Sequence, residues 1–348
     1  MLEQNPSAVL DTNREELRLW RRTTFVSLAI TAVILLCLGA MLDLQETWRQ
    51  VTACDKTLLV LGGLAHYATY FVRGYRWQRC LAHVSSPSQW RMFGLLVFFS
   101  NFVDNVVPGK LADVYQAHLA RINCGVRRST ALGSIVFLRM VDAWVVLVLA
   151  ALTSWWLFAT GLPRAVLWSL LFGVLIAGGV TLIPLAFVLS TMALPRWIPA
   201  RVQQMSRAFH TGMWPPPNQL GLIAVLTGLI WGLEILWTVS LAAAFEVQVR
   251  PVQGIFLAMV PLLAAAFPLT PAGVGAVEVT MYSCLRLLDV PAATAASLTV
   301  VHRLIDHWLH VGMGAWLWAF RRPIGLCTWC EESRPDAPGA QLAKRSLH

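Results

Sequence analysis

Charge is scarce in this sequence. Asp, Glu, Lys and Arg together make up 13% of its 348 residues, whereas a soluble domain usually has about 25%. Hydrophobic residues account for 57%, and the mean hydropathy is +0.61. The shortage of charge excludes a soluble enzyme, a disordered protein and a nucleic-acid-binding module as first interpretations. The composition indicates an all-α integral membrane protein that crosses the bilayer several times.

Several chemical motifs are also missing. The sequence has no glycine-rich nucleotide-binding loop and no nucleophile or metal motif, so we expect no cofactor and no enzymatic activity. Its seven cysteines are an odd number scattered along the chain, which does not fit a disulfide framework. The Cys327-x-x-Cys330 pair has no second pair beside it and is weak support for a zinc or redox site.

Long apolar runs cover most of the chain. Six of them approach or exceed the roughly 20 residues that cross a bilayer, at about 25–42, 57–72, 130–158, 166–190, 220–245 and 292–320. Two further apolar regions, 92–124 and 252–288, are interrupted by proline, glycine and polar residues. Short helices joined in this way are typical of re-entrant hairpins, which protein or a water-filled cavity must surround. We therefore expect six spans and two opposed hairpins.

The basic residues set the orientation of this layout. With both termini in the cytoplasm, the cytoplasmic segments hold 19 of the 27 Lys and Arg residues and the outside segments hold 5, as the positive-inside rule requires. The chain then divides into a basic N-terminus, a first half, a connector, a second half and a tail, at 1–24, 25–190, 191–219, 220–320 and 321–348. We expect it in the cytoplasmic (inner) membrane of a bacterium.

An Arg-x-x-Asp-x-Trp pattern occurs twice, beginning at Arg139 and at Arg303, and each copy follows a Pro/Gly turn and an acidic residue. The acid precedes the arginine by 26 residues in the first copy (Asp113) and by 25 in the second (Glu278). Because one hairpin enters from each side of the membrane, the two copies have inverted topology. Inverted repeats with broken helices are typical of secondary transporters, which work by alternating access.

The order of several motifs resembles a known family. The motifs are Arg73-x-x-Arg76-Trp77, Asn101-x-x-x-Asn105-x-x-Pro108-Gly109, the Arg139/Asp142 span, and the 271–278 loop followed by Arg303. Over about residues 20–320 the chain is similar to the flippase-like membrane domain of lysylphosphatidylglycerol synthetases and to stand-alone members of that family. The resemblance implies movement of a lipid, or of a lipid-linked head group, between leaflets.

The sequence departs from this family after the first turn. Members often have Gly-Glu and then Arg after the first Pro-Gly pair, whereas this chain has Ala112-Asp113 and then Gln116. The acid is kept, but a cationic contact to phosphate is lost. Nothing in the sequence matches the aminoacyl-transferase domain of the synthetases, so synthesis of a lysyl lipid is not implied.

The repeated charges are the first candidates for a substrate site. A charge at the bilayer centre costs about 2.5–3.5 kcal/mol on insertion scales, so Arg139, Asp142, Arg303 and Asp306 must be compensated. In each copy the Arg and the Asp share one helix face and can form a structural ion pair. Alternatively, the two guanidinium groups bind a lipid phosphate, and the carboxylates orient them or carry a proton.

Polar residues near the hairpins are further candidates. Asp113 and Glu278 begin helices, where they are either simple caps or part of the substrate site. We expect Asn101, Asn105 and Lys110 to line the same cavity.

Two more groups have alternative interpretations. Four arginines that follow the second span either anchor it at the membrane interface or capture an anionic lipid. They are Arg73, Arg76, Arg79 and Arg91. Histidines of the second repeat form hydrogen bonds between helices, handle protons, or hold a metal together with Asp306. They are His302, His307 and His310.

The sequence thus predicts a lipid transporter whose substrate is a phosphate-bearing lipid, such as a phospholipid or a polyprenyl-phosphate-linked sugar. The surrounding membrane lipids are its other partners. We expect no nucleic-acid partner. Two rival functions remain open. One is a membrane-embedded enzyme that acts on a lipid phosphate or glycosyl bond, with Asp113 and Glu278 as acid and base. The other is a non-transporting partner of a glycosyltransferase or lipid-synthesis enzyme.

Overall fold

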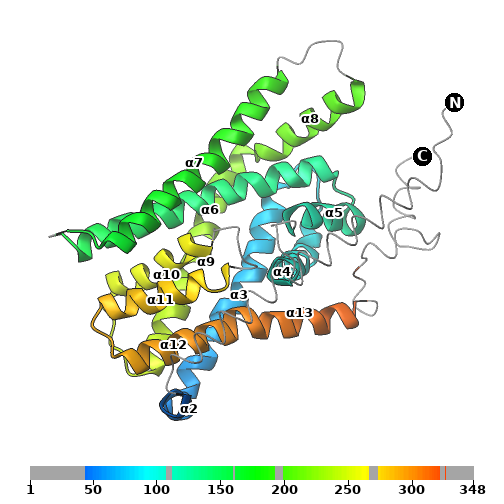
Figure 1. Ribbon diagram of the computed structural model, residues 1–348. Helices are drawn as coiled ribbons and strands as arrows, with labels where there is room; N and C mark the ends of the chain where they lie inside the picture. The colour runs from blue at the N-terminus through cyan, green and yellow to red at the C-terminus, as the bar shows by residue number, and fades with distance from the viewer. Residues whose placement is uncertain are drawn as a thin grey trace, which may run out of the picture.

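Helices form all of the regular structure in the part of the chain that the computed structural model describes, which is residues 44–106, 112–159, 161–192, 199–265, 273–321 and 326 (Figure 1). The longer elements are α2 (Leu44–Ala53), α3 (Lys56–Cys80), α4 (Trp90–Val106), α5 (Ala112–Cys124), α6 (Arg128–Leu157), α7 (Arg164–Met192), α8 (Ala200–Met213), α9 (Leu220–Ala244), α10 (Pro251–Ala265), α11 (Ala276–Leu287), α12 (Ala292–Arg303) and α13 (His310–Ala319). Short 3-10 turns precede α4 (η1, Pro87–Gln89) and α9 (η2, Pro217–Gln219). A π-helical segment, η4 (Leu304–Leu309), joins α12 to α13.

Three helical stretches among these residues are long and apolar enough to cross a membrane, at Arg128–Leu157, Val166–Ala186 and Ala200–Ala244. Their outer faces expose large apolar side chains, including Trp156, Leu175 and Ile183. A soluble protein rarely leaves so much contiguous apolar surface in contact with water. The fold is therefore that of an integral membrane protein.

Some of the expected elements coincide with helices of the structure, and others lie outside the described residues. The apolar runs at 130–158, 166–190 and 220–245 coincide with α6, α7 and α9. The helices α4 and α5, and likewise α10 and α11, lie on the two sides of the expected Pro/Gly breaks. Residues 107–111 and 266–272, which hold the prolines of these breaks, lie outside the described residues, as do the first expected span and both termini. Six spans, re-entrant hairpins and an inverted repeat therefore stay predictions.

Two segments expected as loops contain helices. The amphipathic helix α2 lies in the segment 43–56, where its apolar side, including Val51, packs against the core. The connector 191–219 contains α8, which packs on α6. Neither segment has a long apolar run, so a search for membrane spans by hydropathy passes over both.

The helix α3 joins two apolar clusters that lie in different halves of the sequence. One cluster comes mainly from α3, α4, α5 and the first part of α6, with Phe93 and Leu119 fully buried. The other comes mainly from α9, α10, α11 and α12, with Phe256 and Leu298 fully buried. Because α3 packs along both α4 and α9, its two sides connect the clusters (Figure 1).

Glycines allow the closest of these helix contacts. A Cβ atom on Gly74 of α3 would overlap the backbone of Gly94 in α4, and one on Gly212 of α8 would overlap the backbone of Thr130 in α6. Small residues at helix crossings are the usual means by which membrane helices approach closely, since packing rather than hydrophobicity drives their association.

We expect Gly74→Ala to lower the melting temperature of the detergent-solubilised protein. The clash is with backbone, which cannot rotate away, so the cost should be about 1–3 kcal/mol, as for overpacked cores. Gly228→Ala is the matched control, because in α9 nothing lies within 4 Å of an added Cβ. Equal melting temperatures for the two variants would contradict the close contact between α3 and α4.

Candidate functional site

One face of α3 carries the polar residues of a buried site. His66, Thr69, Arg73 and Arg76 are spaced three, four and three residues apart, so they share one side of the helix. This side packs against α9, which presents Glu234. With partners from α6, α11, α12 and η4, these residues form a chain of alternating charges, which we call the charged seam. Its members, in order, are Arg76, Asp142, Arg73, Glu234, His66, Asp306, Arg303 and Glu278.

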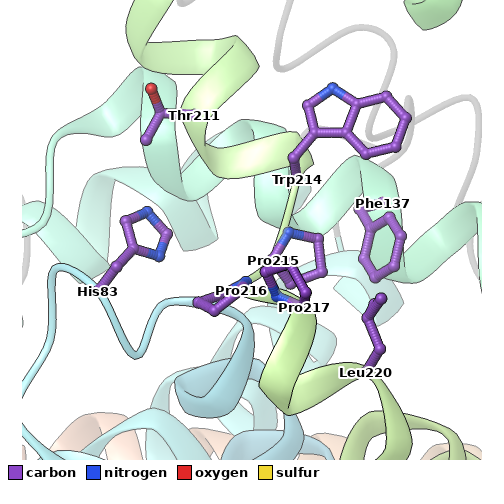
Figure 2. A pocket seen from close by; sticks show the side chains of 8 residues that line it. All are labelled: His83, Phe137, Thr211, Trp214, Pro215, Pro216, Pro217 and Leu220. Atoms are coloured by element: carbon purple, nitrogen blue, oxygen red, sulfur yellow. The ribbon is translucent and has the colours of Figure 1, made fainter.

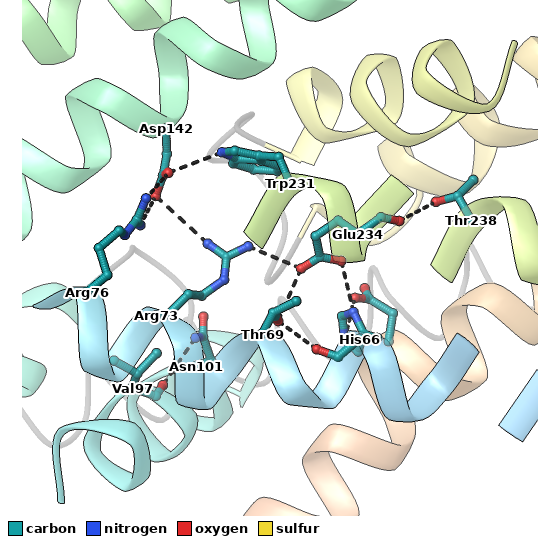
Figure 3. A network of polar contacts seen from close by, with 11 residues as sticks. His66, Thr69, Arg73, Arg76, Val97, Asn101, Asp142, Trp231, Glu234 and Thr238 are labelled. Carbon is teal, nitrogen blue, oxygen red and sulfur yellow. Dashed lines mark hydrogen bonds and ion pairs between the residues drawn. The ribbon is translucent and has the colours of Figure 1, made fainter. Parts of the chain in front are cut away.

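The first end of the seam is a bidentate ion pair. Both terminal nitrogens of Arg76 donate to the two carboxylate oxygens of Asp142, each at 2.7 Å, in the fork geometry that makes arginine–carboxylate pairs strong. Arg76 also donates to Thr227 at 2.8 Å, and the indole of Trp231 donates to Asp142 at 3.3 Å (Figure 3). The Arg76 side chain is only 3% exposed, so this charge depends on its protein partners.

The middle of the seam links α3 to α9. A terminal nitrogen of Arg73 donates to Glu234 at 3.1 Å, and the other lies 3.8 Å from Asp142. The guanidinium carbon of Arg73 also lies 5.3 Å from the ring centroid of Trp231, a cation–π contact. The second oxygen of Glu234 lies 3.0 Å from Nδ1 of His66 (Figure 3). Arg73 is therefore shared between two carboxylates and is held less tightly than Arg76.

The second end of the seam reaches α11 and α12. Asp306 lies 3.4 Å from Nε2 of His66 and 3.6 Å from a terminal nitrogen of Arg303. Arg303 donates through Nε to Glu278 at 2.7 Å, and Glu278 accepts the backbone N–H of Gly275 at 2.7 Å. Gly275 precedes α11 with φ of 91°, a conformation that favours glycine. Glu278 is thus both a helix cap and the partner of a buried arginine.

A π-helical segment positions Asp306. The segment η4 begins directly after Arg303, and π-helical turns inside α-helices are frequent at functional sites. The hydroxyl of Tyr67 on α3 donates to the carbonyl of Ile305 at 2.8 Å. This bond holds the π-helical backbone against α3. Its two residues are direct sequence neighbours of His66 and Asp306, so it supports the contact between those side chains.

A separate ion pair involves the first copy of the repeated pattern. Arg139 donates to Asp113 at 2.9 Å, from α6 to the first turn of α5. The pair matches that between Arg303 and Glu278 in residue type and sequence spacing. The two pairs differ in exposure. The Arg139 side chain is 49% exposed, whereas the Arg303 side chain is 7% exposed.

The repeated Arg and Asp residues are partnered differently in the two copies. Arg303 and Asp306 lie in ion-pair range, as their spacing predicts. In the first copy, Asp142 instead binds Arg76, while Arg139 binds Asp113. The difference arises because α3 brings a second arginine to Asp142, which a pattern within one helix cannot reveal.

Arg73 and Arg76 do not anchor the end of α3 at an interface. Both point into the seam, whereas Arg79 binds the hydroxyl of Tyr75 and Arg91 lies over Trp90. Of the four arginines after the second expected span, the interfacial interpretation therefore fails for the first two. Their side chains lie on the same face of α3 as His66.

The other predicted site residues lie near α4. The amide of Asn101 donates to the carbonyl of Val97 within its own helix at 3.1 Å, and Asn105 is partly buried one turn further on. Gln116, three residues after Asp113, is buried and accepts a hydrogen bond from Ser100 at 3.1 Å. Lys110 lies outside the described residues, as do Cys327 and Cys330.

Sequence reasoning missed His66 and Glu234. Glu234 is the one charged residue in the apolar run 220–245, and an isolated ionisable residue in a span is a functional candidate by default. That signal was available. His66 has no comparable signal, because a lone histidine in an apolar helix is usually a structural residue, and only the fold brings it between two acids.

The three candidate histidines each contact an aromatic ring, and for His307 this ring is that of Trp308. His302 stacks on Trp237, and His310 stacks on Tyr70 with Nε2 at 3.1 Å from the carbonyl of Phe98. Within the described residues, no group of three or more His, Cys, Asp or Glu side chains is placed to hold a metal ion.

A groove outside the seam lies near the ends of α3 and α8. It has a volume of about 600 Å³ and lies between the loop after α3 and the turn from α8 to α9, with His83, Trp214, Pro215 and Leu220 among its lining residues (Figure 2). Burial lowers the pKa of the His83 imidazole. None of the seam residues lines this groove, so it carries none of the seam's chemistry.

Comparison with known proteins supports the membrane assignment. The family described as the lysylphosphatidylglycerol synthase TM region matches residues 24–314. The chain belongs to this family. It is also similar to two UPF0104 membrane proteins of Methanocaldococcus jannaschii. One is 25% identical over 62% of this chain and 92% of the relative, and the other is 20% identical over 83% and 92%. No solved structure matches the chain.

Membership of the lysylphosphatidylglycerol synthase TM-region family covers the whole seam. The matched residues 24–314 begin before α3 and end beyond η4, so every seam residue lies in the family's membrane region. The seam therefore lies in the membrane region of this family, whose description is consistent with a lipid-related role of the protein.

We expect Asp142→Asn to be strongly destabilising, because it leaves the buried Arg76 charge without its bidentate partner. Loss of one member of a buried pair typically costs about 3–5 kcal/mol. The change is measured by thermal or denaturant unfolding in detergent. Arg49→Gln, which breaks the exposed Glu46–Arg49 pair on α2, is the control and should leave stability unchanged. A native melting temperature for Asp142→Asn would contradict the assigned pairing.

Proposed function

We propose that the protein moves a phosphate-bearing lipid, or a lipid-linked sugar, between the leaflets of a bacterial cytoplasmic membrane. The lipid-related family supports this proposal, and so does a row of charges within an apolar helix bundle. Ionisable residues in membrane spans mark substrate, ion or proton pathways. The arginines supply the chemistry, since a guanidinium fork matches the oxygens of phosphate as well as those of carboxylate.

The observation that carries the proposal is the unequal exposure of two matching ion pairs. Arg139 and Asp113 are 49% and 32% exposed, whereas Arg303 and Glu278 are 7% and 8% exposed. Alternating access requires two similar half-sites of which one is open while the other is closed. In the proposed cycle the head group enters beside Arg139, and movement of the two halves then closes this pair and opens the other.

Arg73 is suited to pass a phosphate between these pairs. Its contacts to Glu234 and Asp142 are 3.1 and 3.8 Å, longer than those of Arg76 to Asp142. Its side chain is also more exposed than that of Arg76, at 21% against 3%. An incoming phosphate can therefore compete for Arg73 while Arg76 keeps Asp142 in place.

The rest of the lipid stays outside the seam. The acyl or prenyl chains remain in the bilayer, along apolar surface such as that of α6 and α7, while only the head group enters the polar region. Both termini lie in the cytoplasm in this proposal. There, a glycosyltransferase or another lipid-synthesis enzyme is a suitable partner to supply or use the lipid.

The test is lipid movement by the purified full-length protein in phosphatidylcholine vesicles. The probe is phosphatidylglycerol labelled on an acyl chain with a nitrobenzoxadiazole dye, and dithionite reduces the dye in the outer leaflet only. We expect the wild type to expose the inner-leaflet probe, and Arg139→Gln combined with Arg303→Lys to slow this by about 100-fold, equivalent to about 2.7 kcal/mol.

Arg201→Gln, an exposed arginine of α8 outside the seam, is the control and should move the probe at the wild-type rate. Unchanged movement in the double variant would contradict phosphate binding by these two arginines. A chemically altered probe after incubation would instead indicate an enzyme that acts on the lipid.

A further inference from the structure

His66 lies between two carboxylates. Its Nδ1 is 3.0 Å from an oxygen of Glu234 on α9, and its Nε2 is 3.4 Å from an oxygen of Asp306 in η4. The imidazole is 4% exposed, Glu234 16% and Asp306 33%. The three groups come from different parts of the sequence and meet only in the folded helix bundle.

This arrangement favours an imidazole ring that carries one proton more than the neutral form. A neutral imidazole has one N–H donor and one lone pair, whereas both carboxylates are acceptors when ionised. One of the two contacts would then place a lone pair against a negative oxygen in a buried site. An imidazolium donates to Glu234 through Nδ1 and turns the 3.4 Å contact of Nε2 with Asp306 into an attractive ion pair, which removes this repulsion.

The charge balance of the seam also favours a protonated His66. Arg73, Arg76 and Arg303 contribute three positive charges, and Asp142, Glu234, Glu278 and Asp306 contribute four negative charges. With a neutral His66 the seam carries a net charge of −1, and with an imidazolium its net charge is zero. Uncompensated charge is costly in a buried, low-dielectric setting.

The surroundings of His66 contain further titratable groups on every element that packs against it. They are Tyr67, Tyr70 and Arg73 on α3, Glu234 on α9, His302 on α12, Asp306 in η4 and His310 on α13. All three histidines contact aromatic rings, but His66 also has one ring nitrogen 3.0 Å from Glu234 and the other 3.4 Å from Asp306. The geometry therefore makes His66 the proton acceptor of the group.

We propose that His66, Glu234 and Asp306 form a proton-binding site, and that its proton is required for an anionic lipid head group to bind at the seam. The second part rests on the proposed lipid movement. With the proton bound, the seam is neutral and an arginine can accept a phosphate. Without the proton, the net negative charge repels the phosphate. Coupling of this kind is reciprocal, so the lipid must also favour the proton.

Asp306 gives the proton a route to this site. Its side chain is the most exposed of the three, and it also contacts Arg303, the arginine of the closed ion pair. A proton that arrives through Asp306 therefore changes the charge beside the Arg303–Glu278 pair. The proton site and the second half-site share this residue.

The proton itself is tested by ¹⁵N NMR of histidine side chains in the full-length protein in nanodiscs. We expect one imidazolium at pH 7.5 that is absent from His66→Gln and retained in His83→Gln, the control outside the seam. Asp306→Asn balances the seam without a proton, so we expect the His66 ring to become neutral in that variant. A neutral His66 in the wild type at pH 7.5 would overturn the proposal, whatever the protein transports.

The coupling is tested by the pH dependence of probe movement in vesicles with equal pH on both sides. We expect the wild-type rate to fall about tenfold per pH unit above the titration of His66, as for one required proton. The rate of His66→Gln should be low at every pH, and that of Asp306→Asn should not depend on this titration. The same pH profile in the wild type and His66→Gln would refute the coupling.

The two tests separate the failure of this proposal from the failure of the proposed function. If the wild type moves no probe at any pH, the proposed function and the coupling are both wrong, and NMR alone decides on the proton site. If the wild type moves the probe but His66 is neutral, lipid movement stands and the proton site is wrong. The melting temperatures of the variants confirm that each is folded.

Discussion

The structure depends on the rule that a charge buried among membrane helices must meet an opposite charge. Arg76 is nearly inaccessible and requires Asp142, which holds α3 against α6. Arg73 and His66 require Glu234, which holds α3 against α9. Arg303 requires Glu278, which holds α12 against α11. The polar pairs thus fix how the apolar helices are placed, because apolar surface facing lipid gives little preference for one helix contact over another.

The sequence predicts the helices better than it predicts the contacts between them. Long apolar runs locate α6, α7 and α9, since a span needs length and low polarity, and both are properties of a single segment. The repeated pattern predicts the contact of Arg303 with Asp306, but not the pairing of Asp113 with Arg139 or of Glu278 with Arg303. Arg76 with Asp142 and His66 with Glu234 lie 66 and 168 residues apart, and no local pattern encodes these separations. Hydropathy also passes over the short helices α2 and α8.

The seam combines two properties that a lipid transporter needs. At one end Arg76 binds Asp142 and Thr227 through short hydrogen bonds, which hold these side chains in place. The looser part of the seam, where Arg73 and Asp306 are each shared between partners, offers groups that can exchange a carboxylate for a phosphate or a proton. In the proposed coupling, one proton on His66 makes the seam neutral and so links binding of the head group to binding of the proton.

The central claim is that the Arg139 and Arg303 pairs open alternately. It is tested most directly by reacting the protein in nanodiscs with a water-soluble arginine reagent, p-hydroxyphenylglyoxal, and measuring the modification of both residues by mass spectrometry as anionic lipid is added. The account predicts that Arg139 reacts first without anionic lipid, and that Arg303 gains reactivity as Arg139 loses it. Parallel changes at both arginines, or an Arg303 that stays unreactive under all lipid conditions, would contradict it.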